Sequence, residues 1–202
     1  MTGEIKDIVF DFGGVLVDWN PRYLYKNVFE DKQEMEYFLT HICTDEWNLE
    51  QDRGRTLSEG TRILQKEFPG HHAHIQLFYD QWESMLKSEI HANTSLLPIL
   101  SEKYDLYGLT NWSSETFPIA LERYPFFNLF DGIVVSGEEK MIKPDKKFYQ
   151  ILLDRYKLKS ETSLFIDDNI KNIHAAAEMG FDTIHFTSNT NLKSELIERS
   201  IL

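Results

Sequence analysis

The sequence contains only one cysteine, Cys43, so no disulfide can form within the chain. This is typical of proteins from reducing compartments, and we expect a cytoplasmic location. No apolar run approaches the roughly 18–20 residues that a membrane-spanning helix requires. The segment Met1–Lys6 also lacks the basic and apolar regions of a secretory signal. We therefore expect a soluble protein that does not use a membrane as a partner.

Basic residues are scarce relative to acidic ones. The chain has 21 lysines and arginines against 33 aspartates and glutamates, which gives a formal net charge of −12 at pH 7. Such a surface repels nucleic acids and anionic lipids, so neither is an expected partner. With 202 residues, 42% of them hydrophobic, the chain is long enough for one well-buried domain that carries an insertion.

Four short apolar segments have the character of buried parallel strands, because they are rich in Val, Ile and Phe and end in polar residues, and a fifth segment follows a helix-like stretch. From about residue 96 onward the predicted strands alternate with helical patterns, which is typical of a doubly wound α/β sheet. The predicted strands are 7–11, 106–110, 132–136, 163–167 and 183–186.

The first two predicted strands are separated by more than 90 residues, whereas a crossover usually needs a dozen or a few dozen. The pattern of this interval predicts helices, with apolar residues on one face and charges between them. We expect the helices at 22–30, 32–41, 57–68 and 74–87. Residues 17–95 are therefore predicted to form a helical domain inserted between 1–16 and 96–202, which form the α/β core.

Polar residues end three of the predicted strands, and doubly wound sheets bind ligands at this edge. These residues are Asp11, Thr110 and the pair Asp167-Asp168. Neighbouring strands lie about 4.8 Å apart, so the side chains can converge on one ligand. Clustered carboxylates repel one another unless a cation lies among them, and ligation by oxygen alone suits Mg²⁺. The alternative for the late acidic pair is a simple helix cap.

Four motifs lie in order along the chain: Asp11-Phe12-Gly13-Gly14-Val15-Leu16, Leu109-Thr110-Asn111, Lys143-Pro144-Asp145 and Phe165-Ile166-Asp167-Asp168-Asn169. Together they resemble the motifs of the haloacid dehalogenase-like (HAD) hydrolase superfamily. The sequence is most similar to the branch of α-D-glucose-1-phosphate phosphatase and the phosphatase domain of soluble epoxide hydrolase. The resemblance implies a Rossmann-like core with a mobile helical cap. It also implies a Mg²⁺-dependent phosphatase of small phosphorylated metabolites, sugar phosphates among them.

The resemblance further implies how the phosphoryl group is handled. Asp11 would be the nucleophile that forms an aspartyl-phosphate, and Lys143 would neutralise the charges of Asp11 and the phosphate. Thr110 and the backbone of Asn111 would hold the phosphoryl oxygens, and Gly14 would let the backbone approach the substrate closely. These residues are the predicted catalytic and substrate-binding groups of the core.

The metal set and one departure from the family pattern complete this interpretation. Asp11, Asp168 and the carbonyl of Gly13 would bind Mg²⁺, and Asp167 would bind it through water or orient the site.

Most phosphatases of the superfamily carry a second aspartate, an acid–base group, at the position of Gly13. We therefore expect substrates with comparatively acidic leaving groups. Asp18 is the first candidate for a substitute acid, although a plain turn or cap residue is an equally good interpretation of it.

One stretch of the insertion is a candidate for substrate recognition. Arg53 and Arg55 flank Gly54, and this loop could approach the active site so that Arg53 or Arg55 binds substrate. In the alternative interpretation, Gly54 ends one helix and Thr56 or Ser58 caps the next. Both interpretations can hold together.

Two other functions remain open at this stage. A 2-haloacid dehalogenase-type hydrolase needs no Mg²⁺, and such enzymes lack the late acidic pair that this sequence has. A non-catalytic relative would bind phosphorylated ligands or a protein partner. The sequence does not indicate an oligomeric state.

Overall fold

A computed structural model describes residues 4–202 and contains a five-stranded parallel sheet in the order β5-β4-β1-β6-β7. The strands are β1 (Asp7–Phe10), β4 (Asp105–Thr110), β5 (Gly132–Val135), β6 (Ser163–Asp167) and β7 (Asp182–His185). Each lies within one residue of its predicted range, so the predicted α/β class is confirmed. The chain runs outward from β1 in both directions, which makes the carboxyl end of β1 the expected ligand position.

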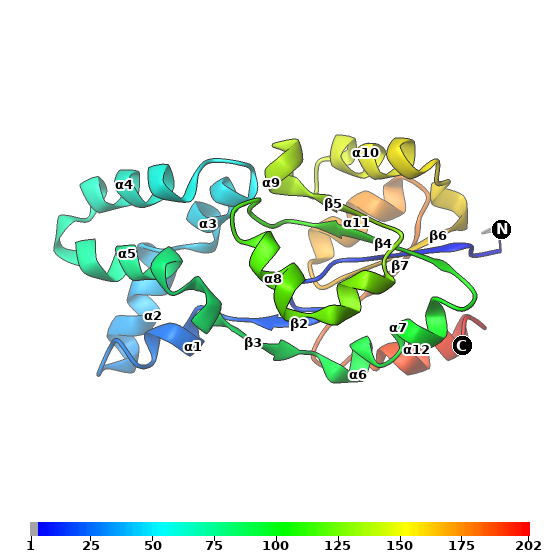
Figure 1. Cartoon of the computed structure of the whole chain (residues 1–202), viewed down its shortest axis with the longest axis horizontal. Helices are drawn as coiled ribbons and strands as arrows, with labels where there is room; N and C mark the ends of the chain where they lie inside the picture. The colour runs from blue at the N-terminus through cyan, green and yellow to red at the C-terminus, as the bar shows by residue number, and fades with distance from the viewer. Residues whose placement is uncertain (1–3) are drawn as a thin grey trace.

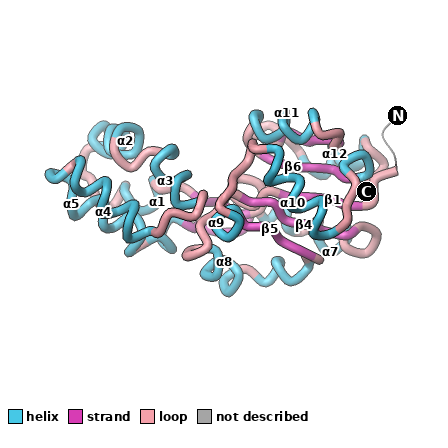
Figure 2. Tube along the Cα trace, turned by 90° about the horizontal axis from the view of Figure 1, so that it is seen from above, coloured by secondary structure: helices cyan, strands magenta, loops and turns pink. Residues whose placement is uncertain are grey.

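Both faces of the sheet are buried, as the apolar composition of its strands requires. Val9, Leu109 and Phe165 face α10 (Lys146–Tyr156) and α11 (Ile170–Glu178). Ile8 and Phe10 face the opposite layer, because alternate strand residues point to opposite sides. That layer contains α6 (His91–Thr94), α7 (Leu97–Leu100), α8 (Phe117–Arg123) and α12 (Leu192–Glu198). Figure 1 shows α10 above the strands and α6, α7 and α12 below them, and Figure 2 looks from the α10 side onto the strands.

A helical lobe lies beyond one end of the sheet (Figure 1). It comprises α1 (Arg22–Tyr25), α2 (Lys32–His41), α3 (Asp45–Asp52), α4 (Leu57–Glu67) and α5 (His72–Asp80). A two-stranded antiparallel ribbon of β2 (Val17–Trp19) and β3 (Leu86–Glu89) connects this lobe with the sheet. The inserted helices that the sequence predicts are therefore present, and the structure adds α3 and the ribbon.

Two of the predicted helices end too late. The predicted helix 22–30 stops after Tyr25, and residues 82–87 are not an α-helix. Trp82–Met85 form a short 3₁₀ turn, and Leu86–Glu89 form β3. The remaining short elements are the α-helical turn α9 (Ser136–Glu139) and 3₁₀ turns at Pro69–His71, Pro125–Leu129 and Ser160–Thr162. No helix within 4–202 has the length and apolar character needed to cross a membrane.

Candidate active site

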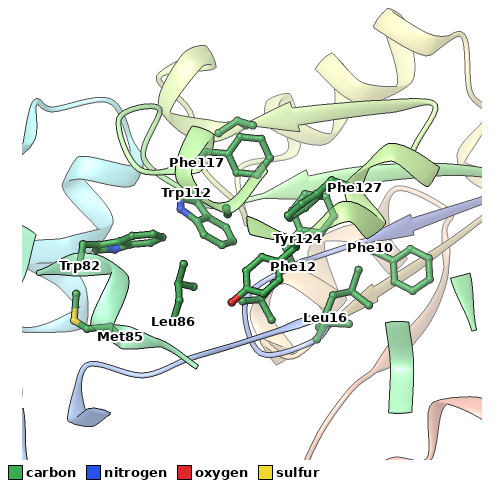
Figure 3. Close-up of a cluster of buried hydrophobic side chains, with 14 of the residues drawn as sticks. Phe10, Phe12, Leu16, Trp82, Met85, Leu86, Trp112, Phe117, Tyr124 and Phe127 are labelled. Atoms are coloured by element: carbon green, nitrogen blue, oxygen red, sulfur yellow. The ribbon is translucent and has the colours of Figure 1, made fainter. Parts of the chain in front are cut away.

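The loop after β1 is anchored by an aromatic side chain. Asp11 follows β1 directly, and the backbone N–H of Phe12 donates to Asp11 Oδ1 over 2.8 Å. The Phe12 ring is fully buried, with a centroid distance of 4.8 Å to Phe127 (Figure 3). Its centroid lies 5.2 Å from that of Phe130. Gly108 in β4 leaves room for it, since a Cβ there would overlap the ring. This packing fixes the position of the Asp11 carboxylate.

The two glycines after Phe12 have different environments. Gly14 has φ +72°, a conformation that favours glycine, and a Cβ on Gly14 would overlap the Asp168 carboxylate. Gly13 has open space around the position of a Cβ, with no heavy atom within 4 Å. Only Gly14 is therefore required by the geometry of the turn.

Three carboxylates meet where β1 and β6 end. Asp11, Asp167 and Asp168 each offer an oxygen, and these oxygens lie within 4.8 Å of one another. Burial raises the pKa of Asp11 to about 7; Lys143 opposes this shift, and Asp167 and Asp168 add to it. Burial and the charge of Asp167 also raise the pKa of Asp168. Such a set of crowded oxygen ligands fits Mg²⁺, which would relieve the repulsion.

A buried lysine joins two of these carboxylates. Lys143 Nζ lies 2.9 Å from Asp11 Oδ1 and 2.7 Å from Asp167 Oδ2, and it donates to the carbonyl of Leu109 over 2.7 Å. Burial alone would lower the pKa of Lys143, but attraction to Asp11 and Asp167 outweighs burial and raises the pKa. The ammonium is therefore charged and directed at the candidate nucleophile.

Asp167 is held by protein groups on both of its oxygens. Oδ1 accepts from the backbone N–H of Asn169 (2.8 Å), Oδ2 accepts from Lys143, and Asn172 Nδ2 lies 3.0 Å from each oxygen. Asn169 caps α11, since its side chain accepts from the backbone N–H of Lys171. Helix capping and the carboxylate cluster thus coexist. Sequence reasoning missed Asn172, whose only signal is its place in the first turn after the acidic pair.

The end of β4 contributes the two polar residues that the sequence singled out. The Thr110 side chain is buried, and its hydroxyl has no hydrogen-bond partner among residues 4–202. An unpaired buried hydroxyl is costly, so this group suits an oxygen of a bound ligand. The Asn111 side chain accepts from the backbone N–H of Lys143 (2.8 Å) and donates to the Lys143 carbonyl (3.1 Å). Asn111 therefore holds the lysine loop beside the carboxylates.

A cavity of about 80 Å³ lies next to these residues, between the sheet end and the helical lobe. The core contributes Gly13, Asn111, Trp112, Ser113 and Thr116, and the lobe and ribbon contribute Trp19, Asn48, Asp52, Tyr79 and Trp82. Trp82 and Trp112 face each other across the two parts, with ring centroids 5.7 Å apart (Figure 3).

Two other sequence candidates lie outside this cavity. The hydroxyl of Tyr23 donates to both Asp18 oxygens (2.9 and 2.8 Å), and Lys87 Nζ lies 3.9 Å from Asp18 Oδ2. Arg53 is half-exposed at the end of α3, with its Nε 3.9 Å from Glu50 Oε1. Neither Asp18 nor Arg53 is among the residues that line the cavity.

The loop around Gly54 has the capping that the alternative interpretation of its sequence predicts. Gly54 has φ +99° two residues after the end of α3, and Thr56 caps α4 by accepting from the backbone N–H of Glu59. The loop also contacts the core, because the Ser136 hydroxyl donates to the Asp52 carbonyl over 2.6 Å. Asp52, which the sequence analysis passed over, is the residue that this loop brings to the cavity.

Known proteins resemble this chain in sequence and in fold. The sesquiterpene phosphatase astK of Aspergillus oryzae is 27% identical over 97% of both chains. The D-ribitol-5-phosphate phosphatase of Bacteroides thetaiotaomicron is 23% identical, over 95% of this chain and 97% of the relative. The magnesium complex of an HAD family enzyme from B. thetaiotaomicron shares the fold, with a TM-score of 0.76 at 21% identity, over 95% of this chain and 98% of that one.

The family assignment rests on most of the chain. The model of the family described as haloacid dehalogenase-like hydrolase matches residues 8–186, which include all four motifs. The chain belongs to the haloacid dehalogenase-like hydrolase family.

Proposed function

We propose that the protein is a Mg²⁺-dependent phosphatase that hydrolyses small phosphorylated metabolites through an aspartyl-phosphate on Asp11. The observation that carries this proposal is the contact of the buried Lys143 ammonium with Asp11 and Asp167, beside Asp168. Two relatives that align over 97% of their own length, a sesquiterpene phosphatase and a D-ribitol-5-phosphate phosphatase, support the reaction class.

In this proposal the core residues position the reacting groups. Asp11 Oδ1 is occupied by the Phe12 N–H and Lys143, so Oδ2 is the oxygen that attacks phosphorus. The Thr110 hydroxyl and the backbone of Asn111 bind the phosphoryl oxygens, and Lys143 stabilises the charge of these oxygens. Hydrolysis of the aspartyl-phosphate by water then releases phosphate and restores Asp11.

Asp11, Asp168 and the Gly13 carbonyl would hold Mg²⁺, with Asp167 orienting Lys143 and the cluster. When bound, Mg²⁺ supplies positive charge that offsets both the carboxylates and the phosphate dianion. This local charge is needed because a protein of net charge −12 repels a phosphate ester overall.

We further propose that residues 17–95 act as a cap over residues 1–16 and 96–202, and that the substrate's alcohol part lies in the cavity between them. Trp19, Trp82 and Trp112 line this cavity, so a carbon skeleton would pack against aromatic faces. The indole N–H of Trp19 is buried without an acceptor within the described part of the chain. A substrate oxygen would satisfy it. Sugar and polyol phosphates carry such oxygens, whereas a terpenyl phosphate carries an apolar chain, and a panel containing all three classes would rank them.

The test is hydrolysis of p-nitrophenyl phosphate with and without Mg²⁺. The wild type should be active only with the metal, and Asp11→Asn should lose at least 10³-fold in kcat, in line with the loss of a nucleophile. Asp18→Asn is the matched control outside the cavity and should keep wild-type activity. Equal activity of the wild type and Asp11→Asn would end the nucleophile assignment. Metal-independent dehalogenation of a 2-haloacid would favour the dehalogenase alternative instead.

A further inference from the structure

The motif residues leave one chemical requirement unmet. A leaving alcohol needs a proton, and Gly13 stands where most phosphatases of the family carry the acid. Lys143 is already committed to Asp11 and Asp167. Among the ten residues that line the neighbouring cavity, Asp52 carries the only carboxyl group. The cavity also includes Gly13, so an acid on the lobe side and the empty acid position on the core side border the same space.

The core fixes the position of Asp52. Asp52 is the last residue of α3, and its carbonyl accepts from the Ser136 hydroxyl over 2.6 Å. The Ser136 oxygen in turn accepts from the backbone N–H of Trp112 over 2.9 Å. Trp112 and Ser113 directly follow Asn111, in the loop that begins at the candidate phosphate site. Asp52 is therefore tied to the catalytic edge of the sheet although it belongs to the helical lobe.

A chain of hydrogen bonds on the lobe side orients the Asp52 carboxyl group. Gln51 Nε2 donates to the Tyr79 hydroxyl (2.8 Å), which donates to Asn48 Oδ1 (2.9 Å). Asn48 Nδ2 then donates to Asp52 Oδ2 over 3.3 Å. Arg55 Nε donates to Gln51 Oε1 at the start of this chain, so every donor points toward Asp52. Such an arrangement holds a side chain in one rotamer, as a catalytic group requires.

The environment of Asp52 keeps it available as a proton donor. Burial raises the pKa of Asp52 to about 7, the Ser113 N–H opposes this shift, and the charge of Asp11 adds to it. Tyr79, the other titratable side chain in the cavity, has a pKa that burial raises far above neutral, so it stays uncharged. General acid catalysis works best when the pKa lies near the working pH.

We propose that Asp52 is the general acid–base residue of this enzyme and replaces the aspartate that is missing at position 13. This inference rests on the proposed phosphatase function. As Asp11 forms its bond to phosphorus and the ester P–O bond breaks, Asp52 passes its proton to the leaving oxygen and becomes a carboxylate. A water molecule then attacks the aspartyl-phosphate and gives a proton to Asp52. The P–O bond to Asp11 breaks, phosphate leaves, and both side chains return to their starting state.

A leaving-group comparison in Asp52→Asn tests this role. The test compares the single-turnover rate of alcohol release, because the later attack of water uses Asp52 with either substrate. With an alkyl phosphate, whose leaving group needs a proton, this rate should fall about 10²–10⁴-fold. With p-nitrophenyl phosphate, whose leaving group needs none, this rate should fall less than about tenfold. Asp45→Asn is the matched control, since Asp45 is an exposed aspartate at the start of the same helix. It should behave as the wild type on both substrates.

A rescue experiment separates catalysis from folding. Gly13 has open space for a side chain, so Gly13→Asp can supply the family's usual acid. The double variant Gly13→Asp/Asp52→Asn should regain at least tenfold of the lost alkyl phosphatase activity. Equal losses on both substrates in Asp52→Asn, or no loss on either, would overturn the proposal. A wild type without Mg²⁺-dependent activity on either substrate would instead overturn the phosphatase function, and this inference with it.

Discussion

Gly14 and Asp168 lie so close that a Cβ on residue 14 would overlap the Asp168 carboxylate. The same glycine has φ +72°, which costs other residues roughly 1–2 kcal/mol. The loop that follows Asp11 can therefore lie against the acidic pair at the end of β6 because residue 14 has no side chain. This contact links the first and last motifs of the family.

Gly14→Ala should therefore move Asp168 out of the carboxylate cluster. We expect a lower Tm and at least a hundredfold weaker activation by Mg²⁺, measured by titrating the metal against p-nitrophenyl phosphate hydrolysis. Gly13→Ala is the matched substitution, because Gly13 has open space and no positive φ. It should keep the Tm of the wild type. Similar effects of the two substitutions on Tm would contradict the different environments described for these glycines.

Thr110 offers a substitution in which stability and activity should change in opposite directions. Its buried hydroxyl is unpaired in the described structure, so Thr110→Val removes a buried polar group that has no partner. The free energy of unfolding should stay constant or rise by about 1 kcal/mol. Activity should fall about 10- to 100-fold if the hydroxyl binds a phosphoryl oxygen. Thr110→Ser, which keeps the hydroxyl, should retain most activity, and a Thr110→Val enzyme with full activity would refute this role.

The stability of the metal-free protein should decrease as the pH rises from about 5 to 8. Burial raises the pKa of both Asp11 and Asp52 to about 7 from the ordinary aspartate value of 3.8. The folded protein then binds more protons than the unfolded chain between these values, so raising the pH through this window favours unfolding. Urea unfolding in EDTA at pH 5.5 and pH 8 measures the change.

Asp52→Asn is the control for this pH dependence. The amide does not titrate, so the loss of stability between the two pH values should be smaller than in the wild type. An unchanged pH dependence in Asp52→Asn would contradict the raised pKa of Asp52. Added Mg²⁺ should reduce the dependence that remains, because a cation favours the charged form of Asp11.

The central sheet and its polar edge were predictable because their signals are local. Each strand is a short apolar run, and Asp11 and the Asp167-Asp168 pair end two adjacent strands. β2 and β3 were not predictable in the same way. They have three and four residues and pair with each other across the whole helical lobe. The formation of β2 and β3 depends on tertiary contacts, which cannot be predicted from the residues within each strand.

Asp52 shows the same limit at the site itself. In the sequence Asp52 directly precedes Arg53, and the positive charge of Arg53 makes that residue the more obvious candidate for binding phosphate. In the structure Arg53 is half-exposed, and the hydrogen bond that holds Asp52 to the core comes from Ser136, 84 positions away. The sequence could place the loop near the active site, but only the fold distinguishes which of its side chains lines the cavity.

Detection of a phosphorylated Asp11 tests the central claim most directly. Acid quenching of the enzyme during turnover of a good substrate with Mg²⁺, followed by borohydride reduction, converts an aspartyl-phosphate into homoserine, which peptide mass spectrometry detects. We predict homoserine at position 11 in the wild type and none in Asp11→Asn. Rapid turnover with an unmodified Asp11, or with homoserine at another aspartate, would contradict the account.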